Sequence, residues 1–360
     1  ADILQINGGA TIPATMDFVS TTQTSGLTKV TTNASTSVAS ISPHANWFAD
    51  TAIVTFDFSG DTTTSGQNVI DLSAPTFGGT TAVATTGSTG PDKITLSDGL
   101  DTVIGGASTG IDTIVIAATA DLNGSGASAI TDSIVVGSGN DVLQINGGVT
   151  LNFGSGGSDP TDKVGAGAFT HVKMDSSATA MSLTVNDTFL ADIGATTIDL
   201  SDDVDTGGVN VVNLAALSST TTMNFTGSSG VDTYTGDAGS ISLITASPGA
   251  DTLNLGAAGT ADTITFNSTA AITGDNITTF TAAEDIIKIH NSLKGTTGGH
   301  ADLSGGITSA DGMLFPSEDW GIEQLGVPST GGIHLDGLMD TADGLAAGKE
   351  RCLEAMDDSR

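Results

Sequence analysis

The chain has 360 residues, of which 41 are acidic and nine basic, so its formal net charge is −32. This charge excludes nucleic acid as an expected partner and argues against electrostatic binding to an anionic membrane. With 48 glycines, one tyrosine and 14% charged residues, the composition favours a thin, repetitive β-structure over a thick globular core. The single cysteine, Cys352, excludes an intrachain disulfide, and no apolar run is long enough to predict a membrane-spanning helix.

The chain opens on ADILQINGG, residues 1–9, and nearly the same phrase returns at residues 141–148 as DVLQINGG. We interpret the first copy as the exit strand of a repeat array that lacks its preceding coil. Residues 1–9 are therefore a candidate joint between subunits of a homo-polymer. The opening residues lack the basic and apolar segments of a signal peptide, so we expect either a processed leader or an export route without one. Residues 1–86 are predicted to form an N-terminal β region.

Residues 87–148 carry a regular ladder of aspartates, which we predict to be the first of two repeat arrays. Successive aspartates lie alternately nine and eleven positions apart, through Asp92, Asp101, Asp112, Asp121, Asp132 and Asp141. A coil of two short strands and two turns would take about 20 residues and stack alternate aspartates into two ladders, with neighbouring coils about 4.8 Å apart. The apolar residues that follow each aspartate at alternate positions would fill a narrow core.

Stacked carboxylates at this spacing repel one another unless a cation lies between them. Ca²⁺ binds six to eight oxygens, which aspartates and turn carbonyls from adjacent coils can supply. Glycines before the aspartates permit the positive φ values that such turns need. The ladder therefore predicts calcium sites at the aspartates of both arrays.

One turn resembles the repeats-in-toxin (RTX) nonapeptide. Gly137-Ser-Gly-Asn-Asp141 matches its G-x-G-x-D kernel well, and the turns before Asp92 and Asp112 match in part. The turns before Asp121 and Asp132 lack the glycine, and the period is longer than that of two successive nonapeptides. The resemblance implies a degenerate calcium-binding β-roll that is secreted by a type I system.

The aspartate pattern returns after an intervening β region, residues 149–198. The second predicted array spans residues 199–270. Its candidate calcium ligands are Asp205, Asp232, Asp251 and Asp262. Another aspartate is expected nine positions after Asp232, but Ile241 stands there.

Residues 271–360 are predicted to form a small mixed cap that includes a possible secretion-signal region. Residues 277–289 resemble the I-x-x-F-x-x-x-x-D-x-I segment that closes many RTX arrays, and residues 345–356 could form one short helix. The chain ends in Asp357-Asp358-Ser359-Arg360 rather than the more apolar tail usual for type I substrates.

The sequence contains no catalytic motif that we can identify. We find no metalloprotease HExxH, no nucleophile elbow, no Walker loop and no dinucleotide fingerprint. The five histidines are scattered, Cys352 has no placed partner, and adjacent acids such as Asp202-Asp203 lack the aromatic and basic neighbours of a polysaccharide-cleaving site. We therefore predict that the protein is not an enzyme.

The sequence as a whole predicts an all-β protein of parallel β-roll or β-helix-like Asp/Gly arrays, with additional β-strands and the small C-terminal cap. Its predicted function is that of a secreted, calcium-binding structural protein that self-assembles into an extracellular layer, sheath or filament. A calcium-dependent adhesin is the main alternative, with a cell-surface polysaccharide as a further candidate partner. A secreted polysaccharide-acting enzyme is the third.

Overall fold

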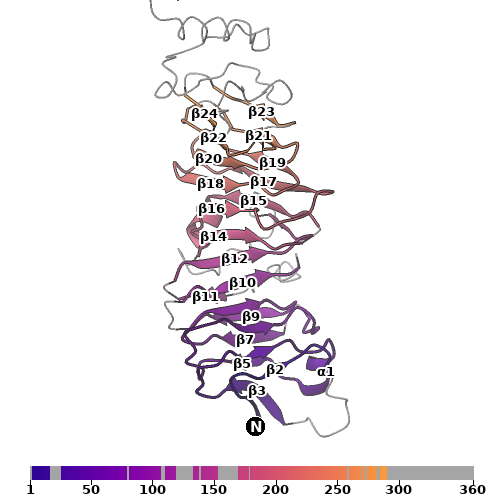
Figure 1. The fold of residues 1–360 in the computed structure, drawn as a ribbon. Coiled ribbons are helices and arrows are strands. Elements are labelled where there is room, and N and C mark those ends of the chain that lie inside the picture. The colour runs from indigo at the N-terminus through magenta and orange to yellow at the C-terminus, as the bar shows by residue number, and fades with distance from the viewer. Residues whose placement is uncertain are drawn as a thin grey trace, which may run out of the picture.

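The computed structural model describes twelve stretches of the chain. They are residues 2–16, 26–78, 81–106, 110–118, 133–137, 139–152, 169–177, 179–257, 259–268, 270–271, 274–281 and 284–289. These residues form a parallel β-solenoid in which the chain winds from one sheet to the opposite sheet and back (Figure 1). Every strand pair is parallel, so the all-β, parallel fold class is confirmed.

One sheet runs the length of the solenoid, and two shorter sheets share the opposite side in succession. Sheet A contains β1 (Asp2–Ile6), β3 (Leu27–Thr32), β5 (Thr55–Asp57), β7 (Ala82–Thr86), β9 (Leu100–Ile104) and β11 (Ser133–Val135). Sheet C contains β13 (Thr150–Asn152), β15 (Ser182–Asn186), β17 (Val209–Ala216), β19 (Val231–Thr235), β21 (Thr252–Asn254) and β23 (Asn276–Thr278).

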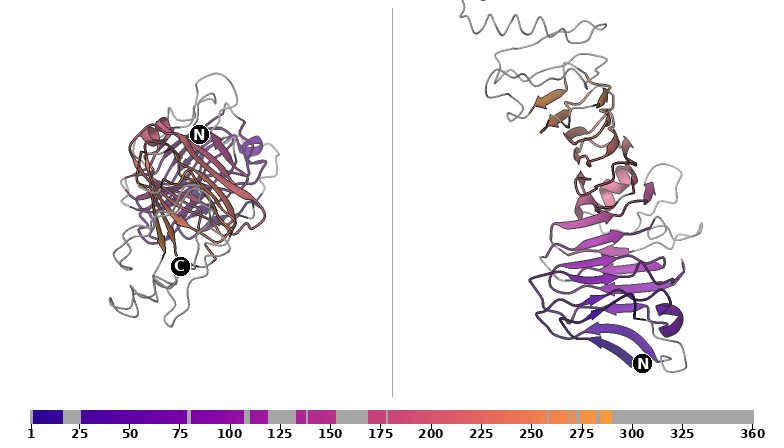
Figure 2. Two further views of the ribbon diagram at one scale, coloured as in Figure 1. Left: turned by 90° about the horizontal axis from the view of Figure 1, so that it is seen from above. Right: turned by 45° about the vertical axis from the view of Figure 1, so that its right-hand side comes forward.

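The long sheet, sheet B, has twelve strands. They are β2 (Thr11–Ile12), β4 (Ser40–Ile41), β6 (Asn68–Asp71), β8 (Asp92–Thr95), β10 (Thr113–Ile116), β12 (Asp141–Ile145), β14 (Phe169–Met174), β16 (Thr197–Asp199), β18 (Thr222–Thr226), β20 (Ile241–Ala246), β22 (Thr263–Phe266) and β24 (Ile286–Ile289). Two short helices, α1 (Trp47–Thr51) and α2 (Asp187–Asp192), interrupt the coils at separate levels (Figure 2).

The core is a column of apolar side chains that passes through every rung of sheet B. Because alternate residues of a strand point to the same face, one inward residue per rung lies directly over its neighbour. The column is Ile12, Ile41, Ile70, Ile94, Ile114, Leu143, Val172, Ile198, Phe225, Ile244, Ile264 and Ile287. All of these side chains except Ile12 are almost fully buried, so burial of this column stabilises the stacking of each coil on the next.

The prediction of a uniform coil length is wrong. On one side Thr113 pairs with Lys93, twenty positions earlier, but on the other side it pairs with Val142, twenty-nine positions later. Insertions in the turns vary the coil length, whereas the strand that each coil contributes keeps its register. The opening phrase and its copy consequently lie in different sheets, β1 in sheet A and β12 in sheet B.

The solenoid contains two related units of eleven strands each, followed by β23 and β24. Strand β1 corresponds to β12, and each later strand of the first unit corresponds to the strand eleven places further on; α1 likewise corresponds to α2. Hydrogen bonds repeat with the strands. Asn68 Oδ1 accepts from Ala39 N at 2.8 Å, and its counterpart Asn210 Oδ1 accepts from Met181 N at 2.9 Å. The opening phrase therefore marks the start of each unit.

The odd number of strands gives the second unit a different orientation. Each coil uses two strands, so a unit of eleven strands ends half a coil out of phase. Strands that lie in sheet A in the first unit have their counterparts in sheet B, and those from sheet B have theirs in sheet C. The second unit is therefore turned by half a revolution about the solenoid axis, and equivalent surface features face opposite sides.

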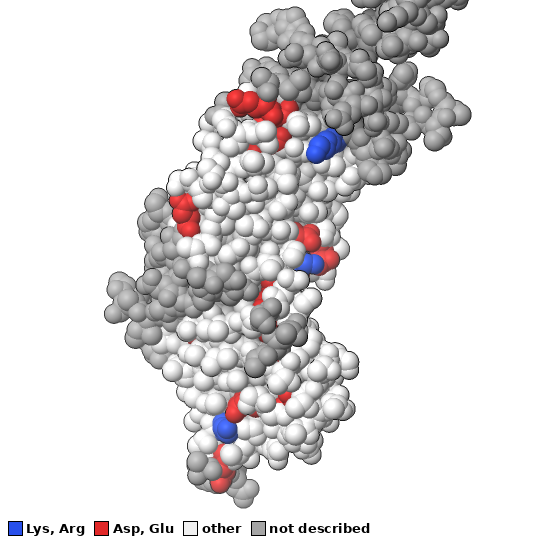
Figure 3. Space-filling model, turned by 90° about the vertical axis from the view of Figure 1, so that its left-hand side faces the viewer, with Lys and Arg blue, Asp and Glu red and all other residues white. Residues whose placement is uncertain are grey.

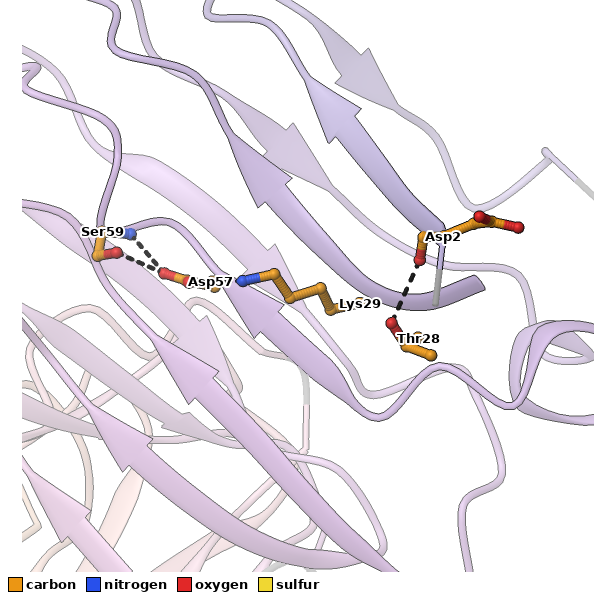
Figure 4. A network of polar contacts seen from close by, with 5 residues as sticks. All are labelled: Asp2, Thr28, Lys29, Asp57 and Ser59. Carbon is orange, nitrogen blue, oxygen red and sulfur yellow. Dashed lines mark hydrogen bonds and ion pairs between the residues drawn. The ribbon is translucent and has the colours of Figure 1, made fainter. Parts of the chain in front are cut away.

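Each unit has a surface ion pair at an equivalent aspartate, although the lysine comes from a different position of the neighbouring strand. Lys29 Nζ lies 3.3 Å from Asp57 Oδ2, and Ser59 donates to Asp57 Oδ1 from its backbone N and from Oγ (Figure 4). Burial raises the pKa of Asp57, but the Ser59 hydrogen bonds and the Lys29 ammonium outweigh it and lower the pKa below its usual value. The counterpart of Asp57 is Asp199, whose carboxylate lies 3.8 Å from Lys173 Nζ. Such exposed pairs contribute little to stability.

Candidate functional site: the aspartate ladders

The predicted ladder is present in the first unit as a chain of side-chain-to-backbone hydrogen bonds. Asp92 N donates to Asp112 Oδ1 at 2.9 Å, and Asp112 N donates to Asp141 Oδ1 at 2.8 Å. Asn68 occupies the rung before Asp92, and its Nδ2 donates to Asp92 Oδ1 at 3.1 Å. Each carboxylate thus accepts a hydrogen bond from the rung before it, which ties neighbouring coils together at the turn.

The second unit repeats this ladder. Asn210 Nδ2 donates to Asp232 Oδ1 at 3.1 Å, Asp232 N to Asp251 Oδ1 at 2.9 Å, and Asp251 N to Asp275 Oδ1 at 3.0 Å. A further ladder follows the opposite turn edge, where Ser242 N donates to Asp262 Oδ1 at 2.6 Å and Asp262 N to Asp285 Oδ1 at 3.0 Å.

A serine four positions before several of these aspartates closes the turn. Ser88 N donates to Asp92 Oδ2 at 2.7 Å, and its hydroxyl lies 3.1 Å from both carboxylate oxygens. Ser97 makes the same contacts with Asp101, and Ser228 donates to Asp232 Oδ2 from its backbone N and to Oδ1 from its hydroxyl. The carboxylates therefore satisfy turn N–H groups that the strands leave without partners.

Many aspartates of the solenoid are buried, and burial raises the pKa of the ladder carboxylates. Twelve aspartates of the described chain are at most 4% exposed: Asp61, Asp92, Asp101, Asp112, Asp141, Asp203, Asp232, Asp237, Asp251, Asp262, Asp275 and Asp285. Burial raises the pKa of Asp92 and Asp275 to about 6, and of Asp112, Asp251 and Asp262 to about 7. For Asp112, the charges of Asp92 and Asp141 raise the pKa further. Burial likewise raises the pKa of Asp141, Asp232 and Asp285.

Three ladder aspartates also keep one oxygen without a hydrogen bond. The Oδ2 atoms of Asp112, Asp141 and Asp275 are buried and have no partner. A buried carboxylate in this state is costly while it is charged, and either a proton or a bound cation would relieve the cost.

The structure brings some of the predicted ligands together and separates others. Asp141 joins the ladder of Asp92 and Asp112, so the prediction that it stacks above Asp121 and Asp101 is wrong, because a longer coil precedes it. Asp101 is buried at the other turn edge, where Ser97 binds it. Asp205 is a half-buried turn residue whose carboxylate accepts from Gly207 N at 2.8 Å. Asp121 and Asp132 lie outside the described residues.

Several ladder members escaped the sequence analysis. Asn68 and Asn210 begin the two ladders but are amides, and Asp275 and Asp285 continue them after coils of 24 and 23 residues. Asn68 follows Gly-Gln and Asn210 follows Gly-Val, and each precedes a short strand with apolar residues. A pattern that allows Asn as well as Asp at this position would have predicted both.

Calcium at the ladders stays a prediction. Within the part of the chain that the structure describes, no three Asp, Glu, His or Cys side chains form a group that could hold a metal ion. One oxygen each of Asp112 and Asp141 is free to bind, so a calcium ion there would have to take most of its oxygens from backbone carbonyls and water.

The buried ladders take many of the acidic side chains of the described residues away from the surface. On the face drawn in Figure 3, the charged side chains of the described residues are few and lie in small, separate groups. Much of the acidity of the described chain is therefore internal and shapes the turns rather than a surface field. None of the helices in this part of the chain has the length and apolar character needed to cross a membrane.

Comparisons with known proteins concern the C-terminal end of the chain. Residues 323–360 match the family described as cobalamin-5-phosphate synthase. An adenosylcobinamide-GDP ribazoletransferase of Prochlorococcus marinus (strain MIT 9303) is 53% identical over 62 residues, which are 15% of this chain and 24% of the relative. Another, from the strain SARG / CCMP1375 of the same organism, is 75% identical over 36 residues, 10% of this chain and 14% of the relative. No solved structure matches the chain.

These matches correct two predictions. The chain spans about a quarter or less of the length of the curated relatives it matches, but those relatives are named as transferases, and this match contradicts the prediction that the protein is not an enzyme. The prediction of a secreted, extracellular or cell-surface protein is overturned by the same match, since the relatives bear the names of a synthase and a transferase rather than of an exported protein.

The matched segment contains an aspartate pattern that the sequence analysis did not consider. Residues 334–345 read HLDGLMDTADGL, with Asp336, Asp340 and Asp343 at spacings of four and three positions. That spacing places three carboxylates on one face of any helix. We had interpreted the region as a cap with a short helix at residues 345–356; this segment lies outside the described residues.

Proposed function

We propose that residues 2–289 serve as a rigid, self-associating β-solenoid scaffold whose aspartate ladders respond to calcium. The observation that carries the proposal is the ladder itself: a line of buried carboxylates that ties coil to coil while leaving the oxygens of Asp112, Asp141 and Asp275 without partners. The degenerate RTX resemblance of residues 87–148 and 199–270 belongs to this proposal. Calcium and protons would compete for the same carboxylates.

Comparison of equivalent rungs supports self-association. Asp141 is buried and Val142 half-buried, because β12 pairs with β10 on one side and β14 on the other. Their counterparts in β1, Asp2 and Ile3, are exposed, Ile3 to 54%, and among the described strands β1 pairs with β3. If a strand of a second copy paired with the other edge of β1, it would cover Ile3 in the way that β10 covers Val142.

One experiment tests both parts of the proposal. Purified chain is titrated with Ca²⁺ and with EGTA, and each sample is followed by circular dichroism, thermal melting and electron microscopy. The proposal predicts a higher melting temperature and larger particles with Ca²⁺, and loss of the particles when residues 1–9 are deleted. Melting that is unchanged by EGTA would remove the calcium part. A monodisperse monomer under all conditions would remove self-association.

A second candidate function rests on the 75% identity over 36 residues. We propose that residues 323–360 contribute to a transferase reaction on a GDP-linked substrate of the class that the relatives' names state, with Asp336, Asp340 and Asp343 binding a divalent cation. Binding of GDP in the presence of Mg²⁺ tests this. Asp336→Asn should weaken binding at least tenfold, and Asp357→Asn should not. Equal affinity for both variants would contradict the role of these aspartates.

A further inference from the structure

A shallow groove crosses the outer face of sheet B where the second unit follows the first. Its volume is about 440 Å³, within the range of ligand-binding clefts. Strands β10, β12 and β14 supply its floor, with the turn after β16 at its rim. The lining includes Ile111, Thr113, Val142, Gln144, His171 and Lys173.

The groove arises at the joint between units. Gln144 of β12 corresponds to Gln5 of β1, and His171 of β14 to Lys29 of β3, so the second unit provides one wall. Ile111 and Thr113 belong to the last coils of the first unit and provide the other.

The groove combines apolar surface with hydrogen-bonding groups of both kinds. Ile111 is 50% exposed and Val142 is half-buried, so the floor offers apolar contact. Gln144 Nε2 donates to Asn146 Oδ1 at 2.8 Å, which leaves its Oε1 as an acceptor. His171 Nδ1 lies 2.7 Å from Thr170 Oγ1, so Nε2 is the ring atom left for a ligand.

The charged groups of the groove nearly balance, with one lysine against two carboxylates. Lys173 Nζ lies 3.8 Å from the Asp199 carboxylate, and the half-buried pair carries no net charge. Asp202 adds a carboxylate at the rim. These groups offer no cluster of basic charge that could hold a polyanion.

We propose that this groove binds an uncharged polyhydroxylated chain, a neutral oligosaccharide that lies across successive rungs. Outward side chains recur about every 4.8 Å along the solenoid axis, so a linear polymer can place hydroxyl groups against Thr113, Gln144 and His171 in turn. Ile111 and Val142 contact its C–H surfaces, and the balanced Lys173–Asp199 pair can donate to and accept from hydroxyls. The inference is independent of self-association and of calcium.

The test is calorimetric titration of the full chain with neutral probes, cellohexaose and maltohexaose, and with an anionic probe, a galacturonic acid hexamer. We expect binding of at least one neutral probe. Gln144→Ala and His171→Ala should each weaken it about tenfold, the effect of one or two lost hydrogen bonds. The matched control Asn213→Ala removes an outward side chain of sheet C and should leave affinity unchanged.

Circular dichroism and melting confirm that each variant keeps the fold. Absence of binding to either neutral probe would overturn the proposal. So would neutral binding that neither Gln144→Ala nor His171→Ala weakens, because the ligand would then lie elsewhere. Preferential binding of the galacturonic acid hexamer would overturn the inference drawn from the balanced charges.

Discussion

Replacing Asp112 by asparagine should stabilise the fold at alkaline pH. Asp112 is fully buried, accepts one backbone hydrogen bond and has one oxygen without a partner. Its pKa is raised from 3.8 to about 7. Because one pKa unit is worth about 1.4 kcal/mol, the ionised carboxylate destabilises the folded protein by about 4 kcal/mol at a pH where Asp112 is ionised in both the folded and the unfolded chain. Asparagine keeps the Oδ1 acceptor but introduces an amide group without a partner, at a cost of about 1–3 kcal/mol.

The net gain for Asp112→Asn is therefore about 1–3 kcal/mol at pH 8. The direction follows from linkage. The folded pKa lies above the unfolded one, so the stabilising effect of proton binding is full below pH about 4 and disappears as the pH rises through about 7. At pH 4 the wild type holds its proton, and the gain should vanish or reverse.

Urea unfolding in EGTA at pH 4 and pH 8 measures this difference. Asp202→Asn, at an exposed position in the turn beside Asp203, is the matched control and should change the unfolding free energy by less than about 0.5 kcal/mol. Destabilisation by Asp112→Asn at pH 8 in EGTA, equal to that at pH 4, would refute the reasoning, because the ionised carboxylate would then be the stabilising form. With Ca²⁺ present, the wild type should gain more stability than the variant.

Three further predictions follow from the fold. Asn210→Ala removes the amide that donates to Asp203, Ser228 and Asp232 and that accepts from Met181 N. It should therefore lower the unfolding free energy, measured in urea, by about 2–4 kcal/mol. A loss below about 0.5 kcal/mol would contradict the claim that the ladder hydrogen bonds stabilise the fold. Gly230→Ala would place Cβ 2.0 Å from the Asp205 carbonyl oxygen and should destabilise the fold by more than about 2 kcal/mol. In the control Gly207→Ala, Cβ meets only a side-chain oxygen at 3.6 Å, so the effect should be mild. Equal melting temperatures of the two variants would show that the coils can move apart at Gly230. A protease should cleave Gly207→Ala and the wild type at equal rates. Faster cleavage of Gly207→Ala would show that the turn at Gly207 opens locally when it is altered.

The sequence was sufficient to predict parallel coils and the first step of the ladder. Asp92 and Asp112 are separated by a coil without an insertion, so their spacing of twenty positions translates directly into stacked rungs. The rung after Asp112 is Asp141, because the next coil is nine positions longer, and a spacing rule cannot distinguish an added turn segment from a missing rung. Hydrogen bonding, not spacing, assigns Asp141 to this ladder.

The orientation of the two units was also beyond the sequence pattern. The repeated phrase at residues 1–9 and 141–148 was visible, but its consequence depends on whether the strand count between the copies is odd or even. Short strands such as β2 and β4, of two residues each, carry too little alternation to be counted. The similarity of residues 323–360 to an enzyme family could not be predicted from ladder spacing or from complete catalytic motifs, because this segment contains neither.

The most direct test of the central claim, that buried ladder carboxylates govern the stability of this solenoid, is the melting temperature as a function of pH in EGTA. The raised pKa values of Asp92, Asp112, Asp251, Asp262 and Asp275 predict that the melting temperature falls as the pH rises from 5 to 8, as the ladder loses its protons. Added Ca²⁺ should restore part of the loss at pH 8. A melting temperature that is constant or rises over this range without calcium would contradict the account.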